Sequence, residues 1–192
     1  EDIENQSLDR DYFFGTILFQ ERGDKHQGYD VIDVVDGQQR ITTIIVFMKV
    51  LLDQLSARLT EEEFEDHGLD LVAETYVVSK NRTKLQAISP DNDFFQSYII
   101  GDDNGYGFIQ TPSQRRLYNA KKYFEKILQD KSIEQLLEFK TKLDSCTKVL
   151  TYSVKDTAEA TLIFETTNDR GKGLTNLEKI KSFLMYKTYL AA

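Results

Sequence analysis

Between an apolar strand pattern and a long apolar helix pattern lies a run of five polar or flexible residues: Asp36, Gly37, Gln38, Gln39 and Arg40. The backbone amides in the first turn of a helix have no partner within the helix and carry partial positive charge, so a helix that begins here offers an anion site. Glycine allows a tight turn and the close approach of a ligand, glutamine supplies amide donors and acceptors, and the guanidinium of Arg40 suits phosphate. This pattern indicates phosphate binding, with Asp36 available to hold a metal or to orient a water molecule.

A purely structural interpretation of the same run stays open. In that interpretation Asp36 caps the helix, Gly37 turns the chain, and the two glutamines are exposed polar side chains without a ligand. Because capping alone would need only one acidic residue in the first turn, the Gln-Gln-Arg order favours binding modestly.

A second polar group follows a predicted helix end and comprises Glu165, Asn168, Asp169 and Arg170, before Gly171. Glu165 and Asn168 are three positions apart and share one helix face, while Asp169 and Arg170 could reach a neighbouring site. An ordinary helix end at Gly171 explains the same residues, and their spacing alone favours that explanation.

Two sets of basic side chains could contact the phosphates of a nucleic acid. Lys80, Arg82 and Lys84 alternate with period two, so they share one face of a predicted strand. The second set lies on a predicted long helix and comprises Arg115, Arg116, Lys121, Lys122 and Lys126. Because the net charge is −8, a solvated surface balanced by the acidic segment 61–66 is the favoured interpretation of both sets.

Other chemistries find little support in the composition. There are 2 histidines and 1 cysteine, so a multi-histidine metal site and an internal disulfide are excluded, and no GxxxxGK[ST] phosphate loop occurs. With 40% hydrophobic and 29% charged residues the chain is an ordinary globular one. No stretch approaches the length of about 18 apolar residues that a membrane helix needs, so we expect a soluble, cytoplasmic protein without a membrane partner.

The elements that must position these residues follow from hydrophobic periodicity and end signals. Strands are predicted over 11–20 and 29–35, joined by a polar loop at 21–28, and a largely buried central helix follows from Ile41. Further predicted elements are a short acidic helix from Thr60 to Gly68, strands over 71–78 and 81–88, a short helix capped by Asp91, and a loop over 101–107. The rest of the chain is predicted to contain a helix from about Pro112 to about Asp130, a helix after Ser132 and a strand over 148–154. A helix capped by Asp156 that stops near Gly171 and a last helix from Thr175 follow.

Strands therefore concentrate early and helices late, which predicts an α+β fold. We expect an α+β core over residues 1–90 and a mainly helical extension over 91–192, the two forming one compact unit. Since the chain opens at Glu1 without a methionine, we also expect it to be truncated at its N-terminus.

Three stretches resemble successive signature blocks of the GmrSD-type restriction endonuclease N-terminal domain. They are YFFGTI (12–17), VVDGQQRITTI (34–44) and IFETTNDRGKGLTNLEKIKSFL (163–184). The core of that family is similar to the ParB and sulfiredoxin fold, so the resemblance implies a small sheet with a buried central helix, followed by a mainly helical subdomain.

The resemblance also implies a function. The family's known members are modification-dependent anti-phage restriction systems, in which this domain binds and hydrolyses nucleoside triphosphate and helps to sense modified DNA. Carried over residue by residue, the catalytic positions would be Asp36, Gln38, Gln39 and Arg40, with Mg²⁺ held through Asp36. The nucleotide-binding positions would be Gly37, Arg40, Thr42, Asn168 and Arg170.

Some parts of such a system are expected to lie elsewhere. Cleavage in this family is assigned to a C-terminal HNH-type nuclease domain or subunit, and no nuclease activity is expected from this chain alone. A segment resembling I-P-x-Y-Q-R that usually precedes the first block is expected upstream. The alternative function is a non-catalytic DNA- or partner-binding module of ParB-like fold, and a homodimer is kept as an alternative assembly.

Overall fold

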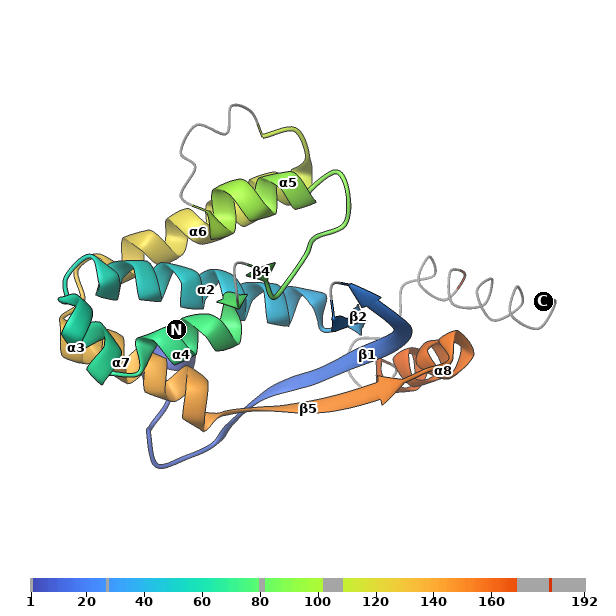
Figure 1. The fold of residues 1–192 in the computed structure, drawn as a ribbon. Helices are drawn as coiled ribbons and strands as arrows, with labels where there is room; N and C mark the ends of the chain where they lie inside the picture. Colours follow the sequence, from blue (N-terminus) through green and yellow to red (C-terminus); the bar gives the residue numbers. More distant parts are fainter. Residues whose placement is uncertain (1, 27, 80–81, 102–108, 169–179, 181–192) are drawn as a thin grey trace. The chain divides into compact units, whose positions relative to one another are not determined.

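The computed structural model describes residues 2–26, 28–79, 82–101, 109–168 and 180 (Figure 1). Within these ranges the chain is mixed α and β, as predicted, with a three-stranded sheet and a two-stranded ribbon besides its helices. The chain separates into two compact units: a helical unit formed by Glu1–Tyr12 and Arg40–Thr147, and a sheet unit formed by Phe13–Gln39 and Lys148–Ala192. The predicted division at residue 90 differs, because that position falls inside the helical unit.

The sheet has the strand order β2-β1-β5, with β1 over Tyr12–His26, β2 over Tyr29–Asp36 and β5 over Thr147–Val154. Strands β1 and β2 are antiparallel, with Leu18 opposite Asp36 and His26 opposite Tyr29. The predicted polar loop over 21–28 is therefore wrong. Residues 21–25 are all exposed, so their charged side chains stay in water while the backbone continues the strand.

Helix α8, over Thr157–Asn168, follows β5 and belongs to the same unit. Its predicted cap is confirmed, because Asp156 Oδ1 accepts a hydrogen bond from the Ala158 amide at 2.7 Å. A small hydrophobic cluster joins the helix to the strands and consists of Leu18, Val154 and Ala160, with Val35, Ile163 and Phe164 packed against them. The predicted helix end at Gly171 and the last helix from Thr175 lie outside the described residues.

The central helix is confirmed as α2, over Gln38–Ser56, in which every residue from Ile45 to Leu52 is buried. Phe47 packs edge-on against Phe124 and Phe139, with ring centroids 5.2 and 6.2 Å apart. Around it lie α1 (Asp2–Asn5), α3 (Glu61–Asp66), α4 (Leu69–Tyr76), α5 (Asn92–Phe94), α6 (Pro112–Leu128) and α7 (Ile133–Thr141), with π-helical turns η1 (Phe95–Ile100) and η2 (Lys142–Cys146). The large hydrophobic core is thus built from helices, together with Val77 directly after α4.

The predicted strands over 71–78 and 81–88 are wrong. Helix α4 occupies most of the first range, and only the two-residue strands β3 (Val78–Ser79) and β4 (Arg82–Thr83) form a ribbon there. Leu69 and Val72, one helical turn apart, are buried, whereas Leu71 is 69% exposed. Burial at helical spacing in the tertiary structure therefore overrides the local β-branched pattern.

In the helical unit the predicted caps at Thr60, Thr111 and Ser132 are confirmed, whereas at Asp91 the helix start is confirmed and the side-chain cap is not. Thr60 with Glu63 and Ser132 with Gln135 form capping boxes, and the Thr111 hydroxyl accepts a hydrogen bond from the Gln114 amide at 3.0 Å. Asp91 makes no side-chain cap bond and instead accepts a hydrogen bond from the Thr111 hydroxyl at 2.6 Å. Among the helices described, none has the length and apolar character needed to cross a bilayer.

Candidate functional site

The polar run of the sequence forms the predicted strand-to-helix junction. Strand β2 ends at Asp36, helix α2 begins at Gln38, and Gly37 between them is buried with φ +84°. Glycine readily adopts this left-handed conformation, whereas residues with a Cβ atom are strained in it, so the turn favours glycine at position 37. The junction therefore places the first turn of α2 directly after the sheet.

Gly37 is also packed closely against the neighbouring strand. A Cβ atom at this position would lie 3.0 Å from the Thr16 carbonyl oxygen and 3.1 Å from Ile17 Cγ1. Both residues belong to β1, whose Leu18 is opposite Asp36 in the sheet. Thr16 and Ile17 thus support the junction, a role that sequence reasoning did not assign. The only sign of this role in the sequence was that both residues lie in YFFGTI, the stretch that resembles a signature block of the family.

The polar side chains of the junction differ in their exposure. Gln38 and Gln39 are exposed, while Asp36 and Arg40 are partly buried. The Gln38 side-chain amide donates a hydrogen bond to the Val34 carbonyl at 2.8 Å, which ties this residue back to β2. Gln39 and Arg40 extend from the first turn of α2, which contains no acidic residue. A carboxylate in this turn would compete with a bound anion for the amides, and none is present there.

The other carboxylates of β2 are engaged in ion pairs with β1. Arg22 Nε lies 2.5 Å from Asp33 Oδ2, and Lys25 Nζ lies 3.7 Å from Asp30 Oδ1. The hydrogen bond and charge of Asp33 raise the pKa of the Arg22 guanidinium, which stays protonated. Asp36, at the end of the strand, is thus the β2 carboxylate nearest to the helix start.

The remaining predicted nucleotide ligands are placed only in part. Thr42 lies in α2 and is partly buried. Asn168 is the last residue of α8, whereas Arg170 lies outside the described residues, so a role for these two positions stays a prediction. In the part of the chain that is described, no group of three or more His, Cys, Asp and Glu residues could hold a metal ion.

The structure places the two predicted basic sets only in part. Lys80 lies outside the described residues, Arg82 lies in the two-residue strand β4, and Lys84 follows that strand. Lys84 therefore lies outside the strand that carries Arg82. In the second set, Lys121 is 7% exposed and donates hydrogen bonds to the carbonyls of Tyr98 at 2.7 Å and Ile99 at 3.3 Å. Lys121 therefore belongs to the interior of the helical unit.

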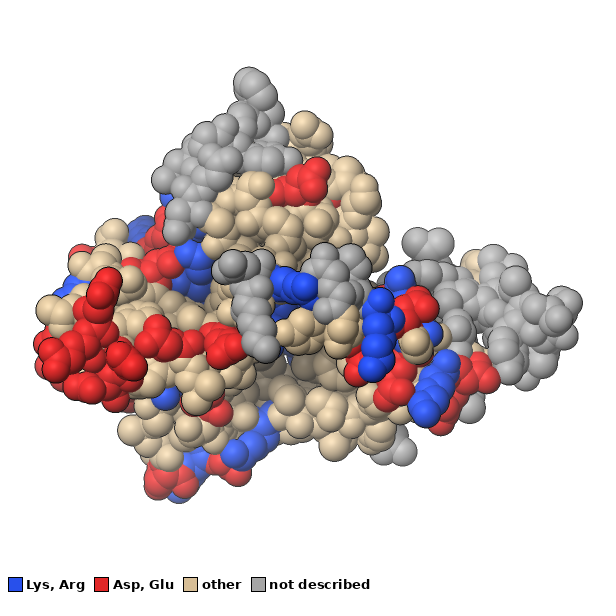
Figure 2. Space-filling model, viewed as in Figure 1, with Lys and Arg blue, Asp and Glu red and all other residues tan. Residues whose placement is uncertain are grey.

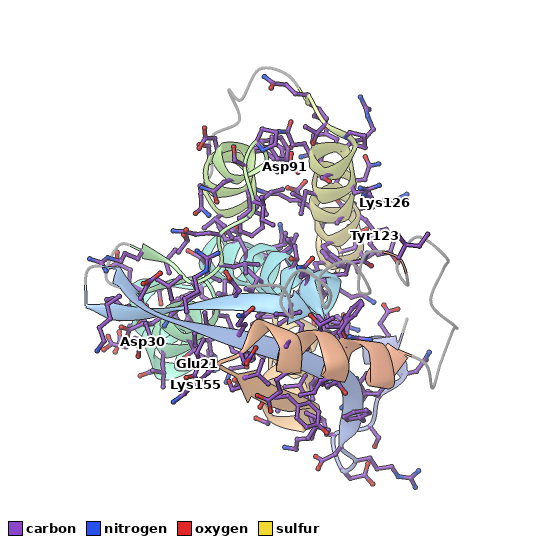
Figure 3. The ribbon with its side chains drawn as sticks, turned by 90° about the vertical axis from the view of Figure 1, so that its right-hand side faces the viewer. Glu21, Asp30, Asp91, Tyr123, Lys126 and Lys155 are labelled. Carbon is purple, nitrogen blue, oxygen red and sulfur yellow. The ribbon has the colours of Figure 1, made fainter. Side chains whose placement is uncertain are left out.

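Residues in or next to the family-like blocks contribute to the small hydrophobic cluster of the sheet unit. Leu18 directly follows the first block, Val35 lies in the second, and Ile163 and Phe164 open the third; all four belong to the small hydrophobic cluster. Figure 3 shows α8 running beside the strands, with its side chains drawn as sticks. The first two residues of the third block thus pack in the same cluster as Val35 of β2, the strand that leads into the junction.

Comparison with known proteins identifies the family of the chain. A comparison with curated proteins finds no match. The profile of the family described as "GmrSD restriction endonuclease, N-terminal domain" matches residues 1–185, which is nearly the whole chain. The chain therefore belongs to the family of GmrSD restriction endonuclease N-terminal domains.

Proposed function

We propose that the β2–α2 junction binds and hydrolyses a nucleoside triphosphate, and that the chain is the regulatory part of a restriction protein acting on modified DNA. The observation that carries the proposal is the junction itself, in which buried Gly37 is followed at once by a helix turn rich in donors and without a carboxylate. Membership of a restriction-system family supports the wider setting. The nuclease is then supplied by a further domain or subunit.

The chemistry of each residue follows from its position. The amides of the first α2 turn would receive phosphate oxygens, and the planar guanidinium of Arg40 would bind two of them at once. The hydrogen bond from Gln38 to Val34 holds this side chain in place, so we assign it a positioning role. Gln39, exposed in the same turn, would orient the attacking water.

Asp36 is the residue that would hold Mg²⁺ together with the phosphates. Protein sites for Mg²⁺ commonly use one or two carboxylates and complete the coordination shell with phosphate oxygens and water. The Asp36 carboxylate fits that requirement, because the nucleotide would bring the other ligands. The ion would neutralise phosphate charge during hydrolysis.

The test compares the unmodified chain with Arg40→Ala and Gln39→Ala by calorimetric titration of each nucleoside triphosphate with Mg²⁺ and by phosphate release. Loss of a charged hydrogen-bond donor costs about 1.5 to 3 kcal/mol, so Arg40→Ala should weaken binding about 10 to 100-fold. Gln39→Ala should retain binding and lower turnover about 100-fold or more, because it removes only the group that orients water.

Lys25→Ala is the matched control, since Lys25 is an exposed cation of the same sheet unit and should leave both quantities unchanged. Equal binding and turnover in all variants would refute the site assignment. Binding without turnover in the unmodified chain would favour the alternative, a non-catalytic module that uses the junction to grip a ligand.

A further inference from the structure

Helix α6 presents one continuous exposed face. The exposed residues recur at helical spacing and carry predominantly basic side chains: Arg115, Arg116, Asn119, Lys122, Tyr123 and Lys126. These six residues are called the basic α6 face below. Gln114, Lys121 and Leu128, on the opposite side, are buried in the helical unit. In Figure 3, Tyr123 and Lys126 lie on the same side of α6.

The charges of the basic α6 face are only partly balanced by neighbours. Lys122 Nζ lies 2.7 Å from Glu125 Oε2, and one guanidinium nitrogen of Arg116 donates to the Ser113 hydroxyl at 3.3 Å. Among the described residues, Arg115 and Lys126 make no ion pair. The face therefore carries unneutralised positive charge along about three helical turns, since it spans 11 residue steps at 3.6 residues per turn.

This charge contrasts with the molecule as a whole. The net charge is −8, and the first turn of α3 alone carries Glu61, Glu62 and Glu63. Figure 2 shows a large group of carboxylates over α3 on the face turned toward the viewer. None of the six residues of the basic α6 face is acidic, and the one acidic residue of α6, Glu125, is paired with Lys122. The face is thus electrostatically complementary to a polyanion.

We propose that the basic α6 face binds the phosphate backbone of double-stranded DNA. It spans about 16 Å along the helix axis, the axial length of about five base pairs, so several phosphates lie within its reach. Arginine, lysine, asparagine and tyrosine side chains all contact phosphate and sugar oxygens. The inference goes beyond the nucleotide chemistry proposed above and concerns residues of the helical unit.

The composition of the face argues against two other occupants. Single-stranded nucleic acid is bound through several aromatic side chains on which bases stack, whereas this face offers only Tyr123. A protein interface is usually anchored by buried apolar or aromatic residues at its centre, and this face has no aliphatic side chain. Positive charge spread along the face without an apolar anchor favours backbone contact with duplex DNA.

The test measures binding of the 192-residue chain to a fluorescent duplex of about 20 base pairs by anisotropy, over about 50 to 200 mM salt. With about three to four phosphates contacted, the logarithm of the binding constant should fall with the logarithm of salt concentration with a slope of about −3. The triple variant Arg115→Gln, Arg116→Gln, Lys126→Gln should flatten this slope toward zero and weaken binding at low salt at least about tenfold. Circular dichroism should show an unchanged fold, because the three side chains are exposed.

A second triple variant, Lys25→Gln, Lys148→Gln, Lys155→Gln, is the matched control. It removes the same charge from exposed lysines of the sheet unit and should keep the slope of the unmodified chain. An equal loss of duplex affinity in both triple variants would overturn the proposal. Displacement of the bound duplex by polyglutamate at equal charge concentration would also overturn it. Arg40→Ala should bind the duplex as the unmodified chain does. This variant therefore distinguishes an error in the proposed nucleotide site from an error in the proposed DNA contact of the basic α6 face.

Discussion

At the scale of single residues, Gly37 controls the junction for two separate reasons. Its φ of +84° disfavours residues with a Cβ atom, and the place of that atom is already occupied by the Thr16 carbonyl and the Ile17 side chain. Gly37→Ala should therefore lower the free energy of unfolding by about 1 to 3 kcal/mol more than a Gly→Ala substitution at a position that has a positive φ but no close contact. Chemical denaturation followed by circular dichroism measures this difference.

Gly28 offers the control for Gly37, because its φ is +89° and a Cβ there would have nothing within 4 Å. Gly28→Ala in the same sheet unit should cost about 1 kcal/mol, the strain of the backbone alone. Equal losses in the two variants would show that the close contact between Gly37 and β1 contributes nothing, and the support assigned to Thr16 and Ile17 would then be wrong.

At the scale of elements, the start of α6 is the helix cap with the most partners. The Thr111 hydroxyl accepts from the Gln114 amide and donates to Asp91 Oδ1, and the Gln114 side-chain oxygen accepts from the Gln110 amide at 2.8 Å. Thr111→Ala should cost about 2 kcal/mol, because it leaves two partly buried partners unsatisfied. Equilibrium unfolding in urea measures the loss.

Thr60→Ala tests the same kind of cap in an exposed setting. Thr60 and Glu63 form their capping box at the surface, where water replaces the lost hydrogen bonds. The expected cost is about 1 kcal/mol or less. If Thr60→Ala were as damaging as Thr111→Ala, the link from α6 to Asp91 would carry no stability of its own.

At the scale of the whole molecule, two hydrophobic clusters stabilise the two units separately. Leu55, 0% exposed, belongs to the large helical cluster, and Leu18, 2% exposed, belongs to the small cluster of the sheet unit. Truncation of a buried leucine to alanine costs about 2 to 5 kcal/mol through lost contacts and a residual cavity. Leu18→Ala should therefore speed amide hydrogen exchange in β1, β2 and α8, while α6 and α7 keep their protection.

Leu55→Ala should give the reverse pattern, with faster exchange in α6 and α7. Hydrogen exchange followed by mass spectrometry resolves these segments in both variants. A uniform rise in exchange over the whole chain for either variant would mean that the two units unfold as one, and would contradict separate stabilisation by the two clusters.

Local signals in the sequence were sufficient for several elements and for the junction. The caps at Thr60, Thr111 and Ser132 and the apolar periodicity from Ile41 predict helices that the structure contains. The strand-to-helix junction was likewise predicted from Gly37 and its neighbours. These features depend on residues within one or two turns of each other, so a single stretch of chain carries the whole signal.

Only the tertiary structure decided the features that depend on distant partners. The sequence from Leu71 to Val78 reads locally as a strand, yet burial of Leu69 and Val72 favours helix α4. Lys121 reads as a surface cation, yet two carbonyls of η1 accept its hydrogen bonds inside the helical unit. The packing of Gly37 against β1 joins residues some twenty positions apart. Burial and hydrogen bonding between such segments are properties of the folded chain, and no local pattern of residue types contains them.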